Sequence, residues 1–202
     1  PLVEDALSLP VRTGKARVIG IKPASLVTKS LVREVKTDDA GCFQSALNPG
    51  LTKIAVIERH KRTGKLGIGI LEGYGLTGGA IATTISHDSH NIVVAGDNDP
   101  DMLLAVRELA DMGGGIVSVH GGAIRRLPLP IAGLMTSADP QEVNAVLHDM
   151  LVAARAELGI PEDVEPFMTL SFMALPVIPE LKLTARGLFN VNTFSFVGVE
   201  AD

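Results

Sequence analysis

One stretch, residues 73–96, constrains the fold of this 202-residue chain most: G-Y-G-L-T-G-G-A-I-A-T-T-I-S-H-D-S-H-N-I-V-V-A-G. Its glycine-rich opening suits tight turns, because glycine has no Cβ to penalise positive φ. Two apolar runs, residues 80–85 and 92–95, are typical of buried strands. Between them stand five polar residues in a row, His87-Asp88-Ser89-His90-Asn91. This polar block is therefore either a loop with a binding or chemical role or a heavily hydrogen-bonded turn.

Two helices are predicted after this stretch, and each begins at an Asp-Pro pair. Asp99-Pro100 and Asp139-Pro140 place a capping carboxylate before a proline at the first helical position. Two strands joined by Gly121-Gly122 separate the helices, and such a tight turn favours antiparallel pairing. We therefore predict an α+β fold, a mainly antiparallel sheet with two long helices in the order β-β-α-β-β-α. An internal duplication is an open alternative.

The remaining segments divide the chain into an arm and one domain. Residues 1–15 lack a sustained apolar period and predict a linker or arm, whereas residues 16–202 form the expected domain. A Gly-containing turn at residues 61–65 joins two apolar segments into a hairpin. Other expected elements are an edge strand or short helix at 26–36, a short buried helix at 166–175, and edge-strand residues at 194–199.

Composition excludes several classes of protein. A net charge of −5 argues against nucleic-acid binding, which favours a basic face. No apolar run approaches the roughly 20 residues that span a bilayer, so no membrane partner is expected. The single cysteine, Cys42, fits a reducing cytoplasm. The apolar fraction of 46% and the mean hydropathy of +0.30 predict that part of the surface is covered by another domain or by a twin subunit.

His87 and His90 are the first candidates for chemistry. They stand three positions apart with Asp88 between them, so the loop could present two imidazoles to an ion or to a polar substrate. Two histidines and one carboxylate leave a tetrahedral metal site short of ligands, so both are weak metal candidates. The competing interpretation is a turn in which Asp88, Ser89 and Asn91 cap backbone amides.

The other candidates have simpler explanations. A surface salt bridge accounts for His60, which follows Glu58 and Arg59. His120 precedes a Gly-Gly turn, and His148 fits a partly exposed position on the second helix. Cys42 has no neighbouring base to activate it as a nucleophile. Three glycines have the spacing of a dinucleotide fingerprint, but a strand rather than a helix follows them, so we reject nucleotide binding. These glycines are Gly73, Gly75 and Gly78.

Four blocks resemble the C-terminal region of bacterial adenine deaminase: K-I-A-V-I-E-R-H-K-R-T-G-K-L-G-I-G-I-L-E-G-Y-G-L, A-I-A-T-T-I-S-H-D-S-H-N-I, L-P-L-P-I-A-G-L-M and P-F-M-T-L-S-F-M-A-L-P-V-I-P-E-L-K-L-T. The resemblance runs from about Ala16 to the end, and the blocks keep the family's order. Two departures concern substrate detail more than fold. Thr77-Gly78 stand where the family tends to carry basic residues, and Ala185 stands where it tends to carry an acid.

The resemblance implies a full-length amidohydrolase that converts adenine to hypoxanthine and ammonia. Its divalent metals, manganese or iron, would lie in an N-terminal (β/α)₈ barrel whose H-x-H motif this chain lacks. The chain would then be an accessory domain, inactive and metal-free by itself, in a cytoplasmic homo-oligomer that acts on a purine. We expect the loop formed by His87, Asp88, Ser89, His90 and Asn91 to face the barrel and shape the substrate pocket.

Three alternatives remain open at this point. The chain could be a non-catalytic binding or oligomerisation module with no tie to deamination. It could belong to a deaminase that acts on another aminopurine. It could also be an independent metalloenzyme built on His87 and His90.

Overall fold

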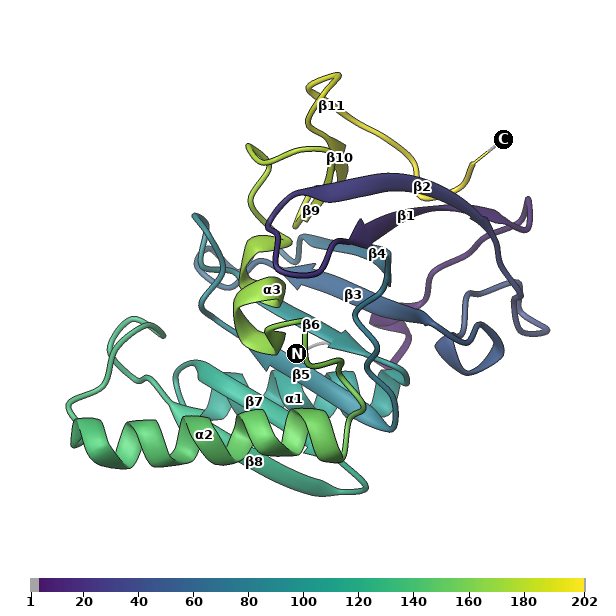
Figure 1. The fold of residues 1–202 in the computed structure, drawn as a ribbon. Coiled ribbons are helices and arrows are strands. Elements are labelled where there is room, and N and C mark those ends of the chain that lie inside the picture. The colour runs from purple at the N-terminus through teal and green to yellow at the C-terminus, as the bar shows by residue number, and fades with distance from the viewer. Residues whose placement is uncertain (1–3, 202) are drawn as a thin grey trace.

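Eight strands form one sheet with the spatial order β2-β1-β4-β3-β6-β5-β7-β8 in the computed structural model, which describes residues 4–201 (Figure 1). Neighbouring strands run antiparallel, except β1 and β4, which are parallel. The strands are β1 (Lys15–Ile21), β2 (Thr28–Glu34), β3 (Leu51–Ile57), β4 (Leu66–Glu72), β5 (Gly79–Thr83), β6 (Ile92–Gly96), β7 (Gly115–His120) and β8 (Ala123–Pro128).

The central strands are mainly apolar because both faces of the sheet are covered. In β3, Ile54 and Val56 point into one hydrophobic cluster, and Ala55 and Ile57 point into another on the opposite face. Successive side chains of a strand alternate between faces, so a strand buried on both sides carries apolar residues on both of them. The continuous run Ile-Ala-Val-Ile is the result.

Helices lie on both faces of this sheet. Helix α1 (Asp99–Asp111) packs on one face, and α2 (Pro140–Ala156) and α3 (Pro166–Phe172) pack on the other. Figure 1 shows α2 and α3 in front of the sheet and α1 behind it. The cap of α1 is Asn98 rather than Asp99, because its side chain accepts from the Asp101 amide at 2.9 Å. Asp139 caps α2 as predicted, accepting from the Gln141 amide at 2.8 Å.

A second, three-stranded sheet lies against β4. It has the order β11-β10-β9, with β9 (Leu181–Thr184), β10 (Gly187–Asn190) and β11 (Ser195–Phe196). The contact requires Gly67, because a Cβ at that position would lie 2.0 Å from the carbonyl oxygen of Thr184. Glycine in a strand often marks such a close approach between backbones.

The N-terminal segment packs on the same body. The short 3₁₀ helix η1 (Glu4–Leu7) is followed by Leu9 and Val11, and the side chains of Leu7, Leu9 and Val11 are buried. The ammonium group of Lys53 donates to the Leu7 carbonyl at 3.0 Å and to the Asp99 carboxylate at 2.6 Å. The buried amine of Lys53 thus connects this segment to the first turn of α1.

The predicted fold class is wrong in its architecture. The α+β prediction gave the order β-β-α-β-β-α, but β1 to β4 precede those elements in the same mixed sheet, and α3 with a second sheet follows them. Helices α1 and α2 cover opposite faces of the large sheet, which the prediction did not specify. The duplication fails on geometry. A duplication would relate β5 to β7 by a twofold axis normal to the sheet, because the two strands are antiparallel neighbours. Such an axis would place both helices on the same face, whereas α1 and α2 lie on opposite faces.

Candidate functional site

The polar loop between β5 and β6, residues 84–91, lies where the central strands end. Thr84 fastens its start, donating to the Gly133 carbonyl at 2.6 Å and accepting from the Gly115 amide at 2.8 Å. Further along, the His87 amide donates to the Ser171 carbonyl at 3.1 Å. These bonds attach the loop to three other segments of the chain, so its conformation is set by long-range contacts.

Arg59 holds the far side of the loop. The register of β3 against β6 pairs Ile57 with Ile92, which brings the residues after β3 beside the loop. The Arg59 guanidinium donates from Nε to the His90 carbonyl at 2.6 Å and from Nη2 to the Ala132 carbonyl at 2.7 Å. His90 and Ala132 both have positive φ, 48° and 60°, a region uncommon for non-glycine residues. Partial burial of Arg59 lowers its pKa below the ordinary value.

His60 has a different partner from the predicted one. Instead of a surface salt bridge, its Nε2 lies 2.8 Å from the Ser89 carbonyl oxygen. The carboxylate of the adjacent Glu58 accepts from the amides of His60, Lys61 and Thr63 at 2.6, 2.7 and 3.0 Å, which lowers the pKa of Glu58 to about 2. The segment after β3 is therefore a support for the loop.

The two loop histidines lie close together but in different surroundings. The His87 ring packs on Phe172 with centroids 4.5 Å apart, and the rings of His87 and His90 are 5.9 Å apart. Burial lowers the pKa of His90, and the neighbouring charges of His87 and Arg59 lower it further. His90 is thus neutral near pH 7, with one ring nitrogen free to accept a hydrogen bond.

Unsatisfied polar atoms concentrate in this loop. Within residues 4–201, four buried side-chain atoms have no hydrogen-bond partner, and three of them are Ser86 Oγ, His90 Nδ1 and Asn91 Oδ1. The fourth is Ser118 Oγ in β7. Buried polar atoms in folded proteins nearly always have partners, so these atoms mark positions that ordered water, a ligand or another protein segment can complete.

The loop does not by itself assemble a set of metal ligands within residues 4–201. Among the residues that the structure describes, no group of three or more His, Cys, Asp or Glu side chains is placed to hold one. His87, Asp88 and His90 therefore do not form the ligand set of a metalloenzyme in this conformation.

A cavity of about 770 Å³ adjoins the loop. Asp88, Ser89 and Asn91 form its polar wall. The segment after α3 and the small sheet form the apolar wall, which includes Phe189, Phe194 and Phe196. This aromatic wall was not predicted, although three of the chain's six phenylalanines stand within residues 189–196.

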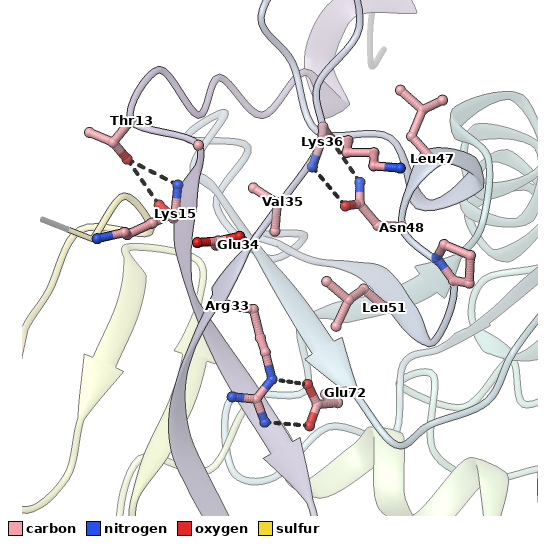
Figure 2. Close-up of a pocket in the computed structure, with 12 residues that line it drawn as sticks. Thr13, Lys15, Arg33, Glu34, Val35, Lys36, Leu47, Asn48, Leu51 and Glu72 are labelled. Atoms are coloured by element: carbon pink, nitrogen blue, oxygen red, sulfur yellow. Dashed lines mark hydrogen bonds and ion pairs between the residues drawn. The ribbon is translucent and has the colours of Figure 1, made fainter.

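A second cavity, of about 640 Å³, lies beside β2 and the 3₁₀ helix η2 (Ser45–Leu47) (Figure 2). Arg33 and Glu72 form a two-point ion pair there, with Nη2 to Oε1 at 2.8 Å. Asn48 exchanges two hydrogen bonds of 2.8 Å with the backbone of Lys36. These polar groups are hydrogen-bonded to one another, so we interpret them as structural contacts and not as a binding site.

The remaining sequence candidates lie away from the loop or have structural contacts. His120 Nδ1 lies 2.8 Å from the Gly78 carbonyl oxygen, and His148 is exposed on α2. The Cys42 sulfur contacts the Ser8 hydroxyl at 3.0 Å. No helix within residues 4–201 has the length and apolar character to cross a membrane.

Comparison with known proteins identifies the class of this domain. A family model described as the adenine deaminase C-terminal domain matches residues 25–195. Adenine deaminase of Nitratidesulfovibrio vulgaris (strain Hildenborough) is 60% identical over 98% of this chain and 34% of the relative. Adenine deaminase 2 of Carboxydothermus hydrogenoformans is 48% identical, and adenine deaminase of Clostridium acetobutylicum 45%, each over 96% of this chain and 34% of the relative.

The chain belongs to the adenine deaminase C-terminal domain family. It spans about a third of the length of these relatives, so they contain a further region that this chain does not. The family resemblance expected from the four sequence blocks is confirmed.

Proposed function

We propose that this chain acts as the C-terminal domain of an enzyme that hydrolyses adenine to hypoxanthine and ammonia. The family match and the names of the relatives support this proposal. The divalent metal, manganese or iron, would be held by residues N-terminal to this chain, in the further region that the relatives contain. We place the enzyme in cytoplasmic purine metabolism, with another aminopurine as the alternative substrate.

Within that enzyme, the loop of His87, Asp88, Ser89, His90 and Asn91 shapes the substrate pocket. The observation that carries this role is the cluster of buried atoms without partners, Ser86 Oγ, His90 Nδ1 and Asn91 Oδ1. Hydrogen bonds from Arg59, His60 and the His87 amide anchor the loop, which supports a role that needs a fixed conformation.

Exposed apolar side chains on both sides of the loop support an interface with the metal-binding domain. Ile131 and Met135 are 47% and 58% exposed, and they stand beside the Ala132 carbonyl that Arg59 holds. On the other side, Val177 and Phe194 line the cavity and are 66% and 77% exposed. Apolar patches around a polar centre are typical of surfaces that another domain covers.

The test is to change His87 or His90 to Ala in the full-length enzyme. Each variant should lower kcat/KM for adenine at least tenfold, about 1.4 kcal/mol of transition-state stabilisation. Metal content and the thermal unfolding midpoint should be unchanged. His148→Ala, on the exposed face of α2, is the matched control and should keep full activity.

Two results would contradict the proposal. Unchanged kinetics in both loop variants would reduce the loop to a structural turn. Loss of metal in either variant would show that the loop belongs to the metal site, which is a different role from shaping the substrate pocket.

A further inference from the structure

Arg59 is a partly buried cation without a counter-charge. Arg33, Arg125 and Arg126 each form an ion pair with Asp or Glu, whereas Arg59 forms none within residues 4–201. Burial accordingly lowers the pKa of Arg59. Withdrawing a charge from water without an opposite charge is unfavourable, so the contacts that Arg59 makes in return indicate its role.

Those contacts are backbone carbonyls of two residues in a strained conformation. Arg59 donates from Nε to the His90 carbonyl at 2.6 Å and from Nη2 to the Ala132 carbonyl at 2.7 Å. His90 and Ala132 have φ values of 48° and 60°. A residue other than glycine keeps this left-handed conformation only where its surroundings hold it there. The guanidinium of Arg59 is one of the groups that hold both residues.

The packing around Arg59 fixes the geometry of these bonds. A Cβ on Gly133 would lie 2.7 Å from Nη2 of Arg59 and 3.0 Å from Oγ1 of Thr84. Thr84, at the start of the loop, donates to the Gly133 carbonyl at 2.6 Å. The planar fork of Arg59 therefore lies between the loop and the turn around Ala132, with no space for a larger residue at position 133.

The next residue holds the preceding carbonyl of the loop. His60 Nε2 lies 2.8 Å from the Ser89 carbonyl oxygen. Arg59 and His60 thus bind successive carbonyls, and together they fix the backbone that carries the His90 ring. A change in φ at His90 would move its imidazole relative to that of His87, whose centroid is 5.9 Å away.

Arg125 provides a contrast, because its contacts support the fold alone. Its Nη1 and Nη2 donate to the Glu157 carboxylate at 2.8 and 2.7 Å, which joins β8 to the end of α2. That pair connects two elements of regular structure, and the carboxylate neutralises the charge. Arg59 connects two irregular segments instead, and one of them contains the candidate loop residues.

We propose that Arg59 is a positioning residue for the reaction of the full-length enzyme. It acts through His90, whose backbone it holds, and does not itself contact the substrate. The role rests on the function proposed above, in which the loop shapes the substrate pocket.

The kinetics of Arg59→Lys in the full-length enzyme test the proposal. Lysine keeps the charge but cannot span the two carbonyls, so kcat/KM for adenine should fall roughly tenfold. Arg125→Lys is the matched control, because it also breaks a two-point contact of an arginine, and its kcat/KM should change by less than about twofold. If Arg59→Lys does not fold, Arg59→Gln removes the charge together with the bonds and takes its place.

A double variant separates positioning from a general loss of stability. If Arg59 acts through His90, Arg59→Lys combined with His90→Ala should have the kcat/KM of His90→Ala alone, within about twofold. Two independent effects would instead multiply to a loss of roughly a hundredfold.

The chain alone gives a readout that does not depend on activity. It has its own buried clusters on both faces of the sheet, so it can be studied by itself. The imidazole NMR signals of His90 should shift in Arg59→Lys. Those of His120, whose Nδ1 lies 2.8 Å from the Gly78 carbonyl oxygen, should stay where they are.

Unchanged kinetics in Arg59→Lys, while His90→Ala loses activity, would overturn the positioning role alone. Multiplied losses in the double variant, or unshifted His90 signals, would do the same. An enzyme inactive on adenine, or unchanged kinetics in His90→Ala, would overturn the proposed function and the positioning role of Arg59 with it.

Discussion

At the scale of single residues, Lys182 is the most unusual ionisable group. It lies in β9 with no exposed surface, and its ammonium donates to the Leu26 carbonyl at 2.8 Å. Burial disfavours the charged form and lowers its pKa from 10.5 to about 8. Between these values the unfolded chain binds more protons than the folded one. Stability therefore rises with pH across this window and is lost as pH falls toward 8.

The predicted effect of Lys182→Met is a change in the pH dependence of stability. The pKa shift corresponds to roughly 3 kcal/mol. Between pH 7.5 and 10.5, the unfolding free energy of the unchanged chain should therefore rise by about that amount relative to that of the variant. Denaturant unfolding at both pH values measures it. Lys29→Met, at an exposed position in β2, should run parallel to the unchanged chain. Parallel curves for Lys182→Met as well would show that burial does not shift this amine.

Lys182 also explains a missed prediction. The run Leu-Lys-Leu-Thr at residues 181–184 was not predicted as a strand, yet β9 is buried at Leu181, Lys182 and Leu183. A lysine in a short run suggests an exposed position, because lysine is rarely buried without a partner. Lys182 therefore hid the apolar pattern that would have predicted a buried strand here.

At the scale of elements, one arginine holds two turns in place. Arg59 connects the loop of residues 84–91 to the turn around Ala132 through two carbonyl groups. A lysine has one ammonium group in place of the guanidinium fork, so it cannot reproduce both bonds in this geometry. Arg59→Lys should lower the unfolding free energy by about 2 kcal/mol, the typical worth of a hydrogen bond to a charged group.

Hydrogen exchange distinguishes this effect from general destabilisation. In Arg59→Lys, the amides of His90 and Met135 should exchange faster, because they close the two turns. Amides in the ladder between β3 and β6 should keep their protection. Arg62→Lys, in the exposed turn that follows, is the control. Uniform loss of protection across the sheet would contradict a local role.

The sequence predicts elements better than it predicts their arrangement. The starts of α1 and α2 were recognisable because capping and proline act within a few residues, as at Asn98 and Asp139. The face that each helix covers was not, because it depends on where β5 to β8 pair within the sheet. For the same reason the polar loop was identified as a candidate, but its cavity was not. That cavity joins Asn91 to Phe194 and Phe196, about a hundred residues further along the chain.

At the scale of the whole molecule, apolar surface remains uncovered around α2. Val146 and Val152 on this helix are 38% and 51% exposed. Figure 1 shows the first turns of α2 and the segment before it extending beyond the sheet. Each such side chain would stabilise an interface by roughly 1 kcal/mol if half of its surface were buried there. Both side chains would contribute to a contact with a second copy of the chain, in line with the apolar fraction of 46%.

We therefore predict that the chain self-associates through this surface. Light scattering across a wide concentration range should give masses above the 21.2 kDa of one chain, rising with concentration. Val146→Glu should shift the mass toward the single chain, because a charge buried at an interface without a partner is costly. Met168→Glu, at a 55% exposed position on α3, should leave association unchanged. A single-chain mass at every concentration would contradict self-association, and equal loss of association in both variants would place the contact elsewhere.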